Sequence, residues 1–268
     1  MARLEQQLWA RRSHKTVLRA WSGLADLQTC ADTLAAMRAA RSVAPVLLPC
    51  PSNKRILVIA PHPDDEVIGP GGTLIGAIDN GCTVRTVYLT SGGPDPATAH
   101  QRETEAKASA SHCGYDTRFL RLAGLAEGVD DDAIAATAAA VAEYQPDLLF
   151  VTFFADDHAE HQRASQVLTM AHDGGLLDGS IEVWAYQVYT AVIANVIVDT
   201  TETQELKSTA IRLFKSQMQR RDWAHFSAGL SAYNSRFLPG RQARHAEIFH
   251  VAPLRDYADL CRPYFHAG

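Results

Sequence analysis

The sequence predicts an α/β protein built on one mostly parallel sheet. Short apolar runs rich in Val, Ile, Leu and Phe alternate along the chain with longer helical stretches, which is typical of parallel strands joined by helices and buried on both faces. Two of the helical stretches end at a glycine, the residue that commonly terminates a helix. The chain of 268 residues, 47% hydrophobic and 21% charged, can cover one large core. We therefore expect a three-layer, doubly wound, Rossmann-like α/β/α fold.

The predicted elements follow one another from residue 55 onward. Six apolar runs are predicted to be strands: Ile56–Ala60, Thr83–Leu89, Arg118–Leu122, Asp147–Phe153, Ile181–Tyr189 and Ala194–Val198. Four stretches are predicted to be helices: Thr73–Asn80, Gln101–His112, Asp131–Tyr144 and Thr203–Trp223. The alternation predicts helices on both faces of the sheet.

Residues 1–50 are predicted to form a helical N-terminal extension and a connector, and residues 51–268 the main domain. Apolar side chains recur at helical spacing from Val17 to Met37. This stripe predicts either a helix that packs on the domain or one that docks a partner, including a second copy in a homo-oligomer. Pro45, Pro49 and Pro51 indicate an extended connector.

Composition excludes several classes of partner. The net charge of −5 argues against nucleic acid, which requires a basic face. No apolar run approaches the roughly 18–20 residues that span a bilayer, and the N-terminus lacks the apolar core of a signal peptide. The five cysteines include no C-x-x-C pair, so we expect free thiols in the reducing cytoplasm.

The first candidate site follows the strand Ile56–Ala60, where the sequence reads His62-Pro63-Asp64-Asp65-Glu66. These side chains lie at the carboxyl end of a strand, the edge of an open α/β sheet where ligands usually bind. His62 and Asp65 are residue types that bind metals, and Asp64 between them is free to act as a base. Capping of a helix N-terminus would account for one or two acids but not for the histidine and prolines.

The second candidate site follows the strand Asp147–Phe153 and repeats this design. Asp156, Asp157, His158, Glu160 and His161 follow the strand in close succession. Histidines three residues apart can converge on one point if they open a helix. One of them would then be a ligand and the other would face the substrate, and the spacing permits either assignment.

Together these motifs resemble those of the PIG-L/LmbE-like deacetylases, zinc enzymes that remove acetyl groups from N-acetylglucosamine-type sugars and related amides. The first motif is the run from Ala60 to Glu66, continued by Gly69, Gly71, Gly72 and Thr73. The run Asp156–His161 is similar to the family's second motif, Asp-x-His-x-Asp-His, although Glu160 stands where the family usually has Asp. The resemblance extends from about Arg55 to about Val251.

The resemblance implies a zinc-dependent deacetylase acting on a small N-acetylated sugar or glycoconjugate. It implies one Zn²⁺ per subunit, with other divalent metals able to substitute. The implied roles are metal ligation by His62, Asp65 and His161, general-base catalysis by Asp64, and oxyanion stabilisation by a protonated His158. Asp156 and Glu160 would orient the ligands.

Four further residues are candidate substrate contacts. Ser91 and Gly92 follow a strand, so they either line the pocket or form a plain turn. Arg102 resembles part of an Arg-x-x-Glu segment that borders the substrate in the family, and a surface ion pair with Glu105 is the alternative. Gln187 either reaches sugar hydroxyls from a late strand or belongs to the core.

Other enzyme classes fit less well. A dinucleotide site starting at Gly69 would need glycine at position 74, where the chain has Leu74. No G-x-S-x-G elbow occurs, which excludes that type of serine hydrolase. An amidase acting on a non-sugar or thiol-conjugate amide stays open. So does a catalytically silent carbohydrate-binding protein, although a mere binder has no need of Asp64.

Overall fold

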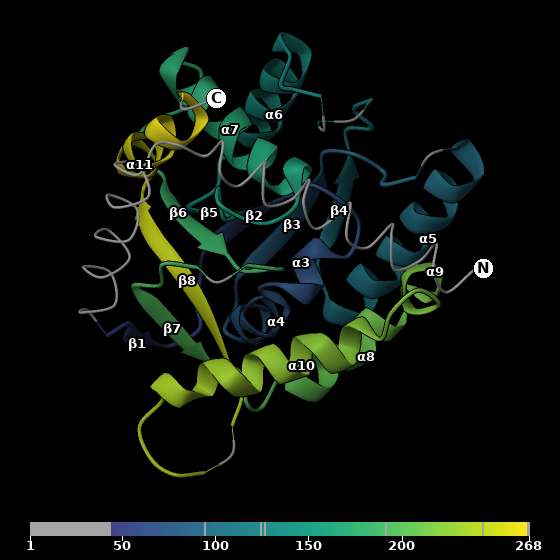
Figure 1. Ribbon diagram of the computed structural model, residues 1–268, viewed down its shortest axis with the longest axis vertical. Helices are drawn as coiled ribbons and strands as arrows, with labels where there is room; N and C mark the ends of the chain where they lie inside the picture. Colours follow the sequence, from purple (N-terminus) through teal and green to yellow (C-terminus); the bar gives the residue numbers. More distant parts are fainter. Residues whose placement is uncertain are drawn as a thin grey trace, which may run out of the picture. The chain divides into compact units, whose positions relative to one another are not determined.

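The computed structural model describes residues 44–93, 95–123, 125, 127–190, 192–242 and 244–266. They form an α/β fold in which one mixed sheet lies between two layers of helices (Figure 1), confirming the predicted fold class. The predicted N-terminal helix falls within residues 1–43, outside the described residues.

The sheet has eight strands in the order β1-β7-β8-β6-β5-β2-β3-β4. Their bounds are β1 Val46–Leu48, β2 Arg55–Ala60, β3 Thr83–Tyr88, β4 Asp116–Phe119, β5 Leu148–Thr152, β6 Glu182–Tyr186, β7 Val196–Asp199 and β8 Ala246–Pro253. Neighbouring strands are parallel except at β8, which is antiparallel to both β6 and β7.

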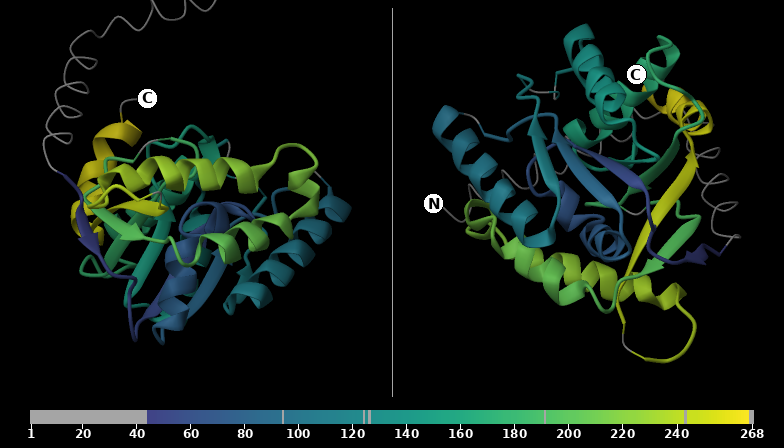
Figure 2. Two further views of the ribbon diagram at one scale, coloured as in Figure 1. Left: turned by 90° about the horizontal axis from the view of Figure 1, so that it is seen from below. Right: turned by 180° about the vertical axis from the view of Figure 1, so that it is seen from behind.

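The helices cover both faces of the sheet (Figures 1 and 2). One face carries α6 Asp131–Tyr144, α7 Ala159–Asp173 and α11 Leu254–His266. The other face carries α3 Asp65–Ile68, α4 Gly71–Asp79, α5 Pro96–Cys113, α8 Gln204–Arg212, α9 Lys215–Met218 and α10 Trp223–Asn234, which is followed by the 3₁₀ helix Ser235–Phe237. Alternate residues of β2 enter different cores: Leu57 packs in the cluster with α7, and Ile56 in the cluster with α4. This two-residue period is why β2 is apolar throughout.

Some predicted elements differ from the structure. The predicted connector contains the edge strand β1, which pairs with β7. The predicted helix Thr203–Trp223 is interrupted at Phe214, which is buried and has non-helical backbone angles (φ −78°, ψ 65°). A new helix, α10, then begins after Asp222, whose side chain accepts a hydrogen bond from the N–H of His225 at 3.0 Å.

The strand β8 and the helix α11 were not predicted. β8 contains Glu247 and His250 among its apolar residues, so its sequence lacks the continuous apolar run of the parallel strands. Its pairing with β6 and β7 joins residues that are distant in the chain.

The order of the strands creates one switch point, at β2. The chain runs from β2 to β3 and β4 on one side, then crosses to β5 on the other side of β2. Ligands of open α/β sheets bind at the carboxyl ends of the strands at such a point. The two candidate motifs follow β2 and β5, so this topology makes them neighbours.

The described cysteines are free thiols, and Cys82, Cys113 and Cys261 are buried. Burial raises the pKa of Cys113 and of Cys261 to about 12, which makes both thiols unreactive. In the described part of the chain, none of the helices combines the length and the apolar character required to cross a bilayer.

Candidate active site

The turn after β2 is held in an unusual backbone conformation by a buried glutamate. Asp64 has a positive φ of 121°, which is costly for a residue other than glycine. Its backbone N–H donates to Glu66 Oε2 at 3.0 Å. Glu66 Oε1 accepts hydrogen bonds from the hydroxyls of Tyr88 and Tyr115, each at 2.8 Å. Burial raises the pKa of Glu66 to about 7, although these hydrogen bonds oppose the shift. The hydrogen bonds of Glu66 thus stabilise the strained turn.

The glycine-rich segment behind this turn allows close packing. A Cβ atom on Gly72 would lie 2.8 Å from Thr200 Cβ, so a side chain there would push α4 away. The buried carboxylate of Glu247 accepts hydrogen bonds from the N–H groups of Gly72 and Thr73 at 2.8 Å. Lys207 Nζ donates to Glu247 Oε1 at 2.7 Å and compensates its charge.

Asp65 lies between two histidines from different turns. Its Oδ2 is 3.1 Å from His62 Nδ1, and its Oδ1 is 3.3 Å from His161 Nε2. Asp65 is 1% exposed and His161 0%. Burial acts to raise the pKa of Asp65, but the charges and close contacts of His161 and His62 outweigh it and lower that pKa. The two turns therefore meet at an ionised carboxylate.

Two further acids contact the same histidine rings: Asp156 contacts His161, and Glu160 contacts His62. Asp156 Oδ1 lies 3.0 Å from His161 Nδ1, and its Oδ2 accepts the N–H of Tyr189 at 3.0 Å. Glu160 contacts His62 Nε2 and accepts the N–H of Leu125 at 3.2 Å. Both acids thus lie where they can orient the histidines.

His158 is exposed and lines the cavity. Its Nδ1 accepts the N–H of Glu160 at 3.3 Å, so a neutral ring carries its proton on Nε2. Burial, together with the charges of His161 and His62, lowers the pKa of His158. The Nε2 atom of His158 can therefore donate a hydrogen bond whether the ring is neutral or protonated.

The residues present fit a metal ion. His62, His158 and His161 each offer a ring nitrogen, and these atoms lie within 4.8 Å of one another. Neither nitrogen of the fully buried His161 has a hydrogen-bond partner of acceptable geometry within the described residues, as expected for a ring that would bind a metal in place of its proton. Burial would lower the pKa of His62 and His161, but the nearby acids raise them to about 9 and about 10. The surroundings favour a positive charge here.

Asp64 is bound by Arg102 from α5. Arg102 is 7% exposed, and its Nη2 donates to Asp64 Oδ1 at 3.2 Å and to the Pro63 carbonyl at 2.7 Å. Burial raises the pKa of Asp64 to about 7, with the charge of Arg102 opposing the shift. The alternative surface ion pair with Glu105 does not form, because Glu105 instead accepts from Ser216 Oγ at 2.6 Å. Arg102 therefore acts on the turn itself.

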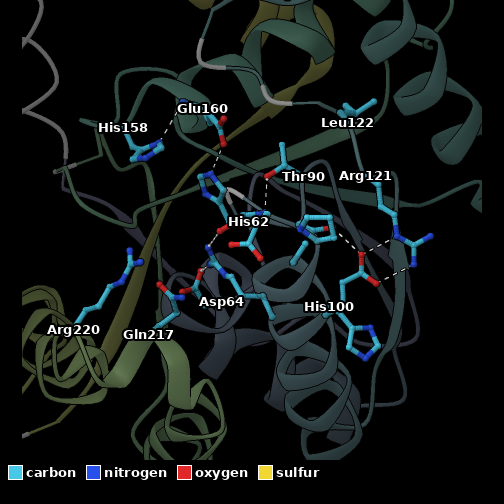
Figure 3. A pocket seen from close by; sticks show the side chains of 18 of the residues that line it. His62, Asp64, Thr90, His100, Arg121, Leu122, His158, Glu160, Gln217 and Arg220 are labelled. Atoms are coloured by element: carbon cyan, nitrogen blue, oxygen red, sulfur yellow. Dashed lines mark hydrogen bonds and ion pairs between the residues drawn. The ribbon is translucent and has the colours of Figure 1, made fainter.

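A cavity of about 1180 Å³ opens above these residues (Figure 3). Ser91 and Gly92 are among its lining residues. Gln187 is not among its lining residues and accepts a hydrogen bond from Asn234 Nδ2 at 3.1 Å. Tyr189, two residues further on, lines the cavity and stacks on His161 with ring centroids 5.0 Å apart.

Sequence reasoning missed several lining residues: His100, Arg121, Gln217, Arg220, Arg221 and Trp223. Residues 217–223 lie in the segment predicted as part of one long helix. The one local signal was the pair Arg220-Arg221, which only Asp222 separates from Trp223. Cations close to an aromatic ring are common in binding sites.

Comparison with known proteins relates both motifs to one family. Residues 57–172 match the family model PIG-L, described as GlcNAc-PI de-N-acetylase. This range begins in β2 and ends in α7, so it includes both turns of the site.

Several solved structures share the fold. The N,N'-diacetylchitobiose deacetylase from Pyrococcus horikoshii is 26% identical with a TM-score of 0.62, over 76% of this chain and 86% of that one. A conserved protein from Thermus thermophilus is 25% identical with a TM-score of 0.61, over 74% and 94%. The 4-carboxy-2-hydroxymuconate hydratase from Pseudomonas putida has a TM-score of 0.61 over 74% and 96%, but its identity of 18% relates the fold alone.

Proposed function

Because this chain carries a PIG-L family domain at residues 57–172, we propose that it is a metal-dependent N-deacetylase acting on an N-acetylated sugar or glycoconjugate. One observation carries the proposal: Asp65 lies between His62 and His161, with Asp64 beside it under a large cavity. A metal site next to a buried carboxylate is the arrangement that amide hydrolysis by activated water requires.

We propose His62, Asp65 and His161 as the ligands of a zinc ion. Asp65 contacts both rings and is buried, whereas His158 is exposed to the cavity. Two histidines and a carboxylate form a common catalytic zinc site with one open position. The alternative ligand set replaces Asp65 by His158. When bound, the ion would supply Lewis-acid chemistry, lowering the pKa of water from about 15.7 toward about 7.

Side chains of the protein would carry out the proton transfers and stabilise the oxyanion. Asp64 removes a proton from the water that attacks the acetamide carbonyl carbon, and Arg102 holds the carboxylate in place for this step. His158 donates a hydrogen bond from Nε2 to the carbonyl oxygen as negative charge develops on it. Asp64 then returns the proton to the nitrogen as the C–N bond breaks. The products are acetate and a free amine.

Release of acetate tests this function. The purified protein is incubated with a panel of N-acetylated sugars, sugar nucleotides and non-sugar amides, and the products are identified by mass spectrometry. We expect acetate release from at least one sugar, its loss after chelation, and its recovery when zinc is restored. Acetate release from non-sugar or thiol-conjugate amides alone would favour the amidase alternative. Sugar binding without hydrolysis, by a protein loaded with metal, would indicate a silent binding protein.

A further inference from the structure

The acidic side chains that line the cavity are already compensated by the protein. Two of them pair with arginines in the wall, Asp64 with Arg102 and Glu103 with Arg121. A third, Glu160, contacts the ring of His62. The fourth, Asp95, accepts hydrogen bonds from the first N–H groups of α5. Arg220 and Arg221 also line the cavity, and neither makes an ion pair within the described residues. One wall therefore carries uncompensated positive charge, although the chain as a whole is acidic.

The turn that carries these arginines is anchored to the rest of the site. The backbone N–H groups of Arg220 and Arg221 donate to the carbonyl of Gln217 at 3.0 and 3.2 Å. The preceding residue, Ser216, is bound through its N–H and its hydroxyl by the buried carboxylate of Glu105, at 3.0 and 2.6 Å. Glu105 belongs to α5, the helix that also supplies Arg102. Helix α5 therefore positions this turn through Glu105 and the proposed base, Asp64, through Arg102.

Arg221 is further oriented by aromatic rings. Its guanidinium lies 5.5 Å from the ring centroid of Trp223 and 5.8 Å from that of Phe226. Stacking uses the face of the planar group and leaves its N–H edge available. The adjacent acid, Asp222, is not among the lining residues and caps α10, so it does not neutralise the pair.

We propose that Arg220 and Arg221 bind an anionic group, a phosphate or a carboxylate, that the substrate carries in addition to its acetamide. Guanidinium edges match these groups by paired hydrogen bonds. In Figure 3, Arg220 and Arg121 lie on opposite sides of the cavity with His62 and Asp64 between them. The volume of about 1180 Å³ exceeds what one sugar ring needs. Resting on the proposed function, this inference makes the substrate an acidic derivative of an N-acetylated sugar.

Binding of matched probes tests the inference without relying on turnover. Calorimetry compares one neutral probe, the methyl glycoside of N-acetylglucosamine, with three anionic probes. These are N-acetylglucosamine 1-phosphate, N-acetylglucosamine 6-phosphate and N-acetylmuramic acid, which carries a carboxylate. We expect one anionic probe to bind about 10-fold tighter than the neutral one, and the preference to shrink at high salt. The double variant Arg220→Gln/Arg221→Gln should lose the preference and retain binding of the neutral probe. The affinities of the three anionic probes then identify the group as phosphate or carboxylate.

Arg236→Gln is the matched control, because Arg236 is an exposed arginine that stacks on Tyr233 and Phe237 and does not line the cavity. It removes the same charge and should leave the preference unchanged. Equal affinity for all probes, absence of binding by every anionic probe, or a preference that survives in the double variant would overturn the inference. Acetate release without a charge preference would reject the anion site but not the proposed deacetylase activity. Charge-dependent binding without acetate release would reject the deacetylase activity but not the anion site.

Discussion

The turns after β2 and β5 contain similar residues but are built differently. In the β2 turn, Asp64, Asp65 and Glu66 are all buried, and a positive φ at Asp64 is held by hydrogen bonds from below. In the β5 turn, His161 is buried, whereas His158 is exposed to the cavity.

This difference indicates a division of labour. A strained turn that is held by hydrogen bonds keeps its carboxylates in one geometry, which suits a metal ligand and a base. The second turn combines a buried ring, suited to ligation, with an accessible ring that can meet a substrate. Substitutions on the two turns should therefore separate loss of metal from loss of rate.

The largest effect is expected from His161→Ala. We expect the metal and the activity to be lost together, because too few ligands remain for tight binding. The loss should exceed the about 10²–10⁴-fold typical of a missing general base. Metal analysis and acetate release measure both quantities. His172→Ala, at the other end of α7, is the control and should keep its metal. Retention of a full metal complement in His161→Ala would rule out His161 as a ligand.

Asp64→Asn should keep the fold and the metal but lose about 10²–10⁴-fold in turnover. An amide has nearly the shape of a carboxylate but cannot accept the proton of the attacking water. Turnover is compared at equal metal content, with the fold checked by circular dichroism. Near-normal turnover would transfer the role of base to another acid, such as Glu66.

His158→Ala should retain its metal and lose about 10²–10³-fold in kcat, with little change in KM, because its hydrogen bond strengthens only as the oxyanion forms. Metal analysis and steady-state kinetics test this, with the exposed His225→Ala on α10 as control. Loss of metal in His158→Ala, together with its retention in Asp65→Asn, would favour the ligand set of three histidines.

The smallest effect is expected from Asp156→Asn, which removes the charge that orients His161. Metal affinity should fall by about 10–100-fold, as measured by competition with a chromophoric chelator. Asp157→Asn, the exposed neighbour, is the matched control and should change little. Equal effects of the two substitutions would show that only general electrostatics are involved.

Much of the fold could be predicted because its signals are local. The helix Asp131–Tyr144 has its predicted bounds, since the side chain of Asp130 caps it and alanine favours it throughout. The apolar run of β2 encodes a strand buried on both faces wherever that strand lies in the sheet. The residue types that close β2 and β5 also predicted a common site, because carboxyl ends of parallel strands share one edge.

Other features depend on contacts between distant segments. That β2 and β5 are neighbours, and that β8 enters the sheet antiparallel, follows from strand pairing over long separations. Such pairing sums many weak contacts that no short window contains. The conformation of Asp64 likewise depends on Tyr88 and Tyr115, which come from other elements.

The candidate site divides in the same way. The sequence alone determined which residues could bind a metal or move a proton, because chemistry belongs to side chains: His62, Asp64, Asp65, His158 and His161. Only the tertiary structure decided that Arg102 binds Asp64 and that Gln187 bonds to Asn234. It also brought Arg220 and Arg221 to the cavity, since a side chain's surroundings depend on how separate helices pack against one sheet.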